Sequence, residues 1–141
     1  MTSDLEVDDV LLLIENKIYI HFLNNILHIE LFEDSLTEGD NTIMHKILDN
    51  FYDNCKKKNL SFYLLYNFSQ LSITSSTNLI YNVHIYQNHF NEHIQFFRSN
   101  LKSLYIIIEN YILRESLDTI LDLYKPEIKP LIIQNIKEIS H

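Results

Sequence analysis

Apolar runs that alternate with segments of helical character are the feature of this sequence that most limits its fold. The runs are Ser61–Tyr66, Leu104–Ile108 and Leu131–Ile133, each bounded by polar residues. Runs of this length and composition predict strands that are buried on both faces of a sheet. Because helical segments separate them, the order predicts right-handed strand–helix–strand crossovers. We therefore expect an α/β fold with a mixed or parallel central sheet of about four to six strands.

The first third of the chain has a different pattern, with three short apolar runs, in the second and third of which apolar and polar residues alternate. Val10–Ile14, Ile18–Phe22 and Ile26–Phe32 are short runs separated by polar residues that suit turns. A period of two predicts a meander of half-exposed strands at the N-terminus. A second possibility is that the capping-box pattern Ser3–Glu6 begins a short helix in place of the first strand.

Three segments suit helices. In the first, apolar residues recur at spacings of three and four between a cap at Asp40 or Asn41 and a closing residue at Asn59. The second, Leu79–Phe97, is aromatic and rich in histidine. The third, Asn110–Tyr124, begins at a capping asparagine and ends before a Lys-Pro pair, which a helix does not continue through.

Length and charge exclude several classes of protein. The chain has 141 residues, which suits one domain, 1–141, with residues 1–9 as an acidic N-terminal tail. The formal net charge is −8, and the first 40 residues alone carry −9. Because such a chain repels phosphate backbones, we expect no nucleic-acid partner. The run Val10–Ile14 is too short to span a bilayer, and we expect no membrane insertion.

The rare residue types restrict the chemistry further. The single glycine, Gly39, cannot supply a glycine-rich phosphate loop, which excludes P-loop and dinucleotide-binding motifs. The single cysteine, Cys55, falls on the apolar face of the first helix, and we interpret it as a buried, inert thiol in a reducing compartment. We therefore expect a cytoplasmic protein. The absence of alanine and the abundance of Ile, Asn and Lys are typical of AT-rich genomes, including those of large DNA viruses, for which the location would be the host cytoplasm or the virion.

One segment matches a catalytic motif. His89-Phe90-Asn91-Glu92-His93 has the inverted zincin pattern H-x-x-E-H. Two histidines four residues apart on a helix can bind one metal ion, and the acid between them can act as a base. A hydrolase of this kind needs a third protein ligand, which the motif does not contain. We favour the alternative of a histidine-rich, partly exposed helix, with no catalytic residue, metal or other cofactor; His89, Glu92 and His93 are the candidates if a metal binds.

Hydroxyl side chains cluster in Ser72-Ile73-Thr74-Ser75-Ser76-Thr77, directly after a predicted strand and before a predicted helix. At a helix N-terminus the dipole and the free N–H groups stabilise a negative group, so a phosphoryl group would be favoured there. The structural alternative is that one of these residues caps the helix.

This region resembles the STAS domain, the fold of sulfate transporters and anti-sigma-factor antagonists. In that family an apolar strand leads into Asp-apolar-Ser-x-apolar and then into Asp-Ser-Ser-Gly at a helix start. Here Leu64–Leu71 is followed by Thr74-Ser75-Ser76-Thr77. The resemblance covers mainly Asn59–Ile80 and Leu101–Ile139, and in the second range a strand, a helix, a last strand and a closing helix follow in the family's order.

The resemblance implies a single STAS-like α/β domain that docks onto a protein partner, with a phosphoacceptor at Ser75 and Ser76 beside it. The sequence departs from the family at three positions. Asn67 and Thr74 stand where the family has aspartates, and Thr77 stands where it has glycine.

We therefore expect a non-enzymatic interaction domain that contacts its protein partner through the Ser72–Thr77 loop and the adjacent helix, under regulation by phosphorylation. The residues expected at that interface are Ser72, Thr74, Thr77 and Asn78. The alternative is a structural protein of a large DNA virus particle, present as a homo-oligomer or within a larger assembly. A third possibility is a metal-dependent hydrolase that uses His89 and His93.

Overall fold

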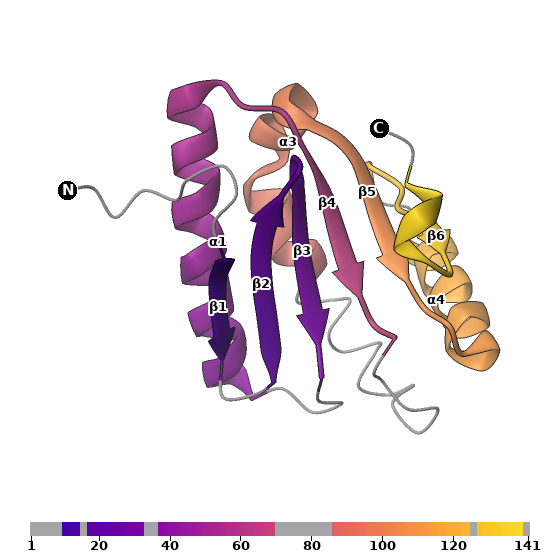
Figure 1. The fold of residues 1–141 in the computed structure, drawn as a ribbon. Helices are drawn as coiled ribbons and strands as arrows, with labels where there is room; N and C mark the ends of the chain where they lie inside the picture. Colours follow the sequence, from indigo (N-terminus) through magenta and orange to yellow (C-terminus); the bar gives the residue numbers. More distant parts are fainter. Residues whose placement is uncertain (1–9, 15–16, 33–36, 70–85, 125–126, 140–141) are drawn as a thin grey trace.

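Six strands lie side by side in the order in which they follow along the chain (Figure 1). The computed structural model describes residues 10–14, 17–32, 37–69, 86–124 and 127–139. The strands are β1 (Val10–Ile14), β2 (Ile18–Leu23), β3 (Ile26–Leu31), β4 (Phe62–Asn67), β5 (Leu101–Ile107) and β6 (Leu131–Ile133). Strands β1, β2 and β3 are antiparallel neighbours, whereas β3, β4, β5 and β6 are parallel. The predicted α/β class, mixed sheet and N-terminal meander are confirmed.

Residues 10–14 form a strand rather than part of a helix, so the alternative prediction of a short helix in this position is wrong. The capping pattern at Ser3–Glu6 lies outside the described residues. Pairing with β2 satisfies the backbone groups of Val10–Ile14 that face β2. The apolar run Val10–Ile14 therefore forms an edge strand of the sheet.

Asparagines in the left-handed backbone region shape two connections. Asn24 and Asn25, with φ of 54° and 63°, form the two-residue turn between β2 and β3. Both central residues of such a turn need a positive φ, which asparagine tolerates better than other residues with side chains. Asn59, with φ of 50°, closes the helix before β4, as its position in the sequence predicted.

The long helix α1 (Glu38–Lys58) begins earlier than the sequence indicated. Its N-cap is Thr37, so the prediction of a cap at Asp40 or Asn41 is wrong. Asp40 instead completes a capping box: its carboxylate accepts from the Thr37 N–H at 2.9 Å, while the Thr37 hydroxyl accepts from the Asp40 N–H at 3.0 Å. This reciprocal pair satisfies two N–H groups at the helix start.

The second predicted helical region is divided in two. Residues 86–92 are helical, His93 lies at a turn, and α3 (Ile94–Asn100) follows directly. Residues 79–85 of the predicted segment lie outside the described part of the chain. Helix α4 (Tyr111–Tyr124) begins as predicted, because the Asn110 side chain accepts from the N–H groups of Ile112 and Leu113 at 2.9 and 3.1 Å. A short 3₁₀ helix, η2 (Ile136–Glu138), ends the described chain.

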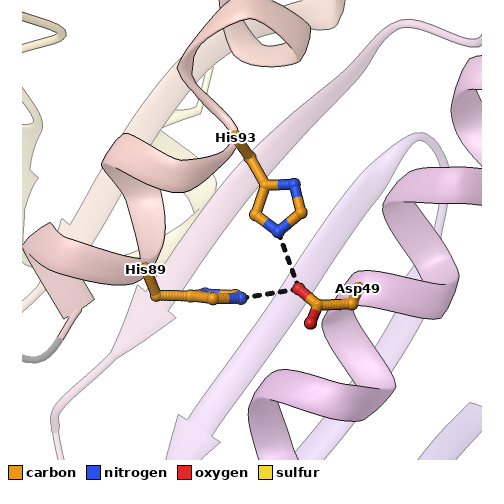
Figure 2. Close-up of side chains that lie close together, drawn as sticks. All are labelled: Asp49, His89 and His93. Atoms are coloured by element: carbon orange, nitrogen blue, oxygen red, sulfur yellow. Dashed lines mark hydrogen bonds and ion pairs between the residues drawn. The ribbon is translucent and has the colours of Figure 1, made fainter.

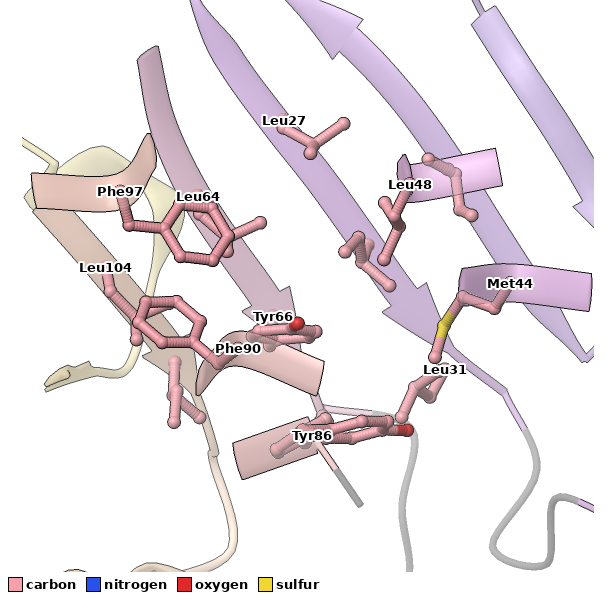
Figure 3. Close-up of a cluster of buried hydrophobic side chains, with 14 of the residues drawn as sticks. Leu27, Leu31, Met44, Leu48, Leu64, Tyr66, Tyr86, Phe90, Phe97 and Leu104 are labelled. Atoms are coloured by element: carbon pink, nitrogen blue, oxygen red, sulfur yellow. The ribbon is translucent and has the colours of Figure 1, made fainter. Parts of the chain in front are cut away.

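The helices α1, α3 and α4 pack on one face of the sheet, and the main core lies between them (Figures 1 and 3). The strand order explains this arrangement. The parallel strands β3 to β6 follow one another across the sheet in the order of the chain, and right-handed crossovers that all proceed in one direction across a sheet place their helices on the same face. Rings from α1, β4 and α3 meet at the centre of this core, where Tyr52 and Phe62 contact Phe96 and Phe97. The opposite face carries a smaller buried cluster, which comprises Ile26, Leu65, Tyr105, Ile107, Ile133 and Ile139.

Strand β4 is buried on both faces, as predicted, because Leu64 and Leu65 point to opposite sides and both are fully buried. Strand β6 does not fit that prediction. It lies at the edge of the sheet, and Leu131 is 53% exposed. An apolar run marks a strand, but the number of neighbouring strands decides how much of that strand is covered.

Candidate functional site

Five polar side chains meet where α1 faces the helical segment 86–92 and the turn after it. His45 and Asp49 are four residues apart on α1, and opposite them lie Tyr86, His89 and His93. We call these five residues the polar seam. It interrupts an otherwise apolar contact, since Met44, Leu48 and Tyr52 on the same helix belong to the main core.

One carboxylate oxygen joins the two histidines of the seam (Figure 2). Asp49 Oδ1 lies 2.8 Å from His89 Nε2 and 2.7 Å from His93 Nε2. Possible metal-binding atoms of the three residues all lie within 4.8 Å of one another. The histidine side chains are 7% and 14% exposed, whereas that of Asp49 is 45% exposed. The group is thus a buried imidazole pair with a carboxylate on its solvent side.

Opposing effects set the ionisation of this group. Burial raises the pKa of Asp49, whereas the hydrogen bonds from His89 and His93 lower it. The lowering effects together are larger, so the pKa lies below its usual value. Asp49 is therefore ionised at neutral pH. Burial lowers the pKa of His45 to about 4, helped by the nearby His89 and opposed by Asp49, so His45 is neutral. An ionised carboxylate and neutral imidazoles are the forms that bind metals.

His45, which is partly buried, and Tyr86, which is buried, complete the seam. The His45 ring is stacked on the His89 ring with centroids 3.9 Å apart and planes 4° from parallel. Two polar atoms of the seam, His45 Nε2 and Tyr86 Oη, are buried and have no hydrogen-bond partner within the described part of the chain. Such orphaned groups are few in folded proteins and call for an explanation, because leaving one unpaired costs about 1–3 kcal/mol.

Only two of the three candidate ligands in the H-x-x-E-H motif lie together in the structure. His89 and His93 converge on one point, as their spacing predicts, but Glu92 is exposed and is not part of the cluster. The segment 86–92 is partly exposed, as the favoured interpretation expects, and His89 lies on its buried side. Sequence reasoning missed Asp49, whose one local signal is the spacing of four from His45.

The predicted docking loop lies outside the described residues. Ser72, Thr74, Ser75, Ser76, Thr77 and Asn78 all fall there, so their roles stay predictions. Asn67, the last residue of β4, lies before this loop, and its side-chain oxygen accepts a hydrogen bond from the Ser69 N–H at 3.0 Å. Asn67 also lies 3.3 Å from His28 Nε2 and lines a polar cavity of about 190 Å³.

Cys55 is buried, as predicted, and burial raises the pKa of its thiol to about 12. A thiol with this pKa is almost entirely protonated at neutral pH and is a poor nucleophile or ligand. Cys55 therefore belongs to the core rather than to a site.

Comparison of the chain with models of protein families, with curated proteins and with solved structures finds no match. The resemblance to STAS domains therefore stays a prediction, and function has to be inferred from the site. Among the described helices, none has both the length and the apolar character needed to cross a membrane.

Proposed function

We propose that the protein binds a divalent transition-metal ion of the zinc class through Asp49, His89 and His93, and that the ion links α1 to the segment that contains the two histidines. The observation that carries this proposal is the convergence of two imidazole Nε2 atoms on one carboxylate oxygen (Figure 2). Imidazole nitrogen and carboxylate oxygen are common ligands of zinc, and two histidines with one acid form a known ligand set.

The distances fit such an ion after a small adjustment. Zinc binds nitrogen and carboxylate oxygen at about 2.0–2.2 Å, so two ligands at a tetrahedral angle lie about 3.3–3.4 Å apart. The Asp49–His89 and Asp49–His93 separations are 2.8 and 2.7 Å. The ligand atoms therefore need to move apart by about 0.6 Å, which is within the range of side-chain torsions.

The surroundings support a structural role for the ion rather than a catalytic one. A catalytic metal faces a cleft that receives the substrate. The ligands line neither the polar cavity beside Asn67 nor the small apolar cavity of about 50 Å³ bounded by Tyr66, Phe68 and Phe90. The acid that a hydrolase of the H-x-x-E-H type would use, Glu92, is exposed outside the ligand group.

Metal titration of the purified protein tests this proposal. We expect the wild type to bind one zinc ion per chain, measured by competition with a chromophoric chelator and by elemental analysis after dialysis. His93→Asn and Asp49→Asn should each weaken zinc binding by about tenfold or more. Glu92→Gln is the matched control, because it changes the acid of the motif yet leaves the ligand group intact, and it should bind as the wild type does. Equal affinity in all four proteins would contradict the proposal.

A second role, as a non-enzymatic domain that docks onto a protein partner, is proposed on the sequence cluster Ser72–Thr77. One structural observation favours an interaction surface in addition to that loop. Leu123 on α4 is 78% exposed, and Leu131 on the edge strand β6 is also exposed. These elements lie at one end of the sheet (Figure 1). Exposed apolar side chains beside an unpaired strand edge are typical of association surfaces.

Affinity capture from the native source tests this second role. Ser75→Glu and Ser75→Ala should change the amount of a captured partner to different extents, if the loop is regulated by phosphorylation. Leu123→Asp and Leu131→Asp should reduce capture if the β6 end contributes, and Thr119→Asp on the exposed side of α4 is the control. Stoichiometric association with a large assembly, unaffected by either Ser75 variant, would favour the virion-protein alternative instead.

A further inference from the structure

We infer that His45 is the fourth ligand of the proposed metal ion, so that the polar seam forms a closed site with three imidazoles and one carboxylate. The inference rests on the proposed function, because it concerns the same ion. It adds a residue that lies outside the three-residue ligand group and that no sequence motif contains.

Helix geometry places His45 where a fourth ligand is needed. His45 and Asp49 are four residues apart on α1, and His89 and His93 are four residues apart on the facing segment. Residues at this spacing lie on one side of a helix, one turn apart. The two pairs face each other, and His45 contacts His89 through its stacked ring, 3.9 Å away between centroids, although its nitrogens lie outside the group formed by Asp49, His89 and His93.

The unpaired nitrogen of His45 is the second, independent observation. Its Nε2 atom is buried and has no hydrogen-bond partner among the residues that the structure describes. A buried imidazole nitrogen without a partner is unfavourable, and a metal ion would supply one. The ring planes of His45 and His89 are nearly parallel, so the His45 ring has to turn about its side-chain torsions to direct Nε2 at the ion.

The number of protein ligands distinguishes a structural metal site from a catalytic one. Structural zinc sites are four-coordinate with all positions filled by the protein, whereas catalytic sites keep one position for water or substrate. With His45 bound, the site holds no water ligand and offers no position to a substrate. The half-exposed Asp49 would then mark the side from which the ion enters.

X-ray absorption spectroscopy of the zinc-loaded wild type tests the inference without any substitution. We expect multiple-scattering features of three imidazoles and a first shell of four nitrogen or oxygen atoms. Cobalt(II) loading should give the intense visible bands of a tetrahedral ion. A fit with only two imidazoles would overturn the role of His45 and leave the proposed function intact. Failure of the wild type to bind zinc or cobalt at all would overturn both.

Substitution of His45 separates ligation from stacking. His45→Phe keeps an aromatic ring against His89 but removes the nitrogen, and it should lower zinc affinity by about tenfold or more. His28→Gln removes a histidine from the other face of the sheet and is the matched control. Zinc affinity of His45→Phe equal to that of the wild type would show that the ring only packs on His89, and would overturn the inference.

Discussion

Zinc is expected to raise the free energy of unfolding, because its ligands come together only in the folded chain. Asp49 is 40 residues from His89 and 44 residues from His93. Closing a loop of 44 residues in an unfolded chain costs about 4 kcal/mol of conformational entropy. The unfolded state should therefore bind zinc through these residues about a thousandfold more weakly than the native state does.

The size of the effect follows from this difference in affinity. When binding to the unfolded state is negligible, free zinc at a hundred times its dissociation constant adds about 2.7 kcal/mol to the free energy of unfolding. For a domain of this length that corresponds to a rise in Tm of roughly 10 °C. The measurement is differential scanning calorimetry at fixed free zinc, with a chelator-treated sample as reference.

Variants decide whether the rise in Tm comes from the proposed site. Glu92→Gln should keep the full shift, and His93→Asn should lose most of it. An equal shift in His93→Asn and the wild type would show that zinc binds elsewhere, and the structural link between α1 and the histidine segment would be refuted. A fall in Tm with zinc would show preferential binding to the unfolded chain.

Three further predictions concern stability in the absence of metal. Burial and the nearby His21 lower the pKa of His28 to about 4. Below pH 6.5 the unfolded chain takes up a proton there that the folded chain does not, so urea denaturation should show the free energy of unfolding falling by about 2.5 kcal/mol from pH 6.5 to 4. His28→Gln should remove that part of the fall. Leu48→Ala, at a fully buried position of α1, should cost about 2–5 kcal/mol, whereas Ile43→Ala, nearly half exposed on the same helix, should cost well under half of that. Asn59→Ala should cost about 1 kcal/mol by equilibrium denaturation because its φ is 50°, and Asn59→Gly should be neutral or stabilising.

Much of the fold could be predicted from periodicity, while element ends could not. Strand β5 begins at Leu101, earlier than the apolar run Leu104–Ile108 indicates, because its first residues pair with β4 although Lys102 is polar and exposed. Helix α1 begins one turn before its predicted caps, because Thr37 and Asp40 cap it together. In both cases the decisive interaction is a hydrogen bond that involves a backbone N–H group, to another strand in β5 and to a capping side chain in α1, and hydropathy does not report such bonds.

Half of the candidate site was visible in the sequence. The spacing of His89 and His93 is enough to predict that they share a helix face. Their carboxylate partner is far away along the chain, and neither the H-x-x-E-H motif nor local spacing identifies it. Glu92, which the motif offered as an acid, lies in sequence between the two histidines but is exposed outside their cluster.

The order of the strands explains why Asp49 is the partner. Helix α1 connects β3 to β4, and the histidine segment lies in the next connection, from β4 to β5. Because these three strands are parallel neighbours in chain order, the two connections lie next to each other on the same face of the sheet. Polar residues at the inner edge of one helix must then meet polar residues at the inner edge of the other. The convergence of Asp49, His89 and His93 thus depends on topology, because the strand order brings the side of α1 that carries His45 and Asp49 against the segment that carries the two histidines.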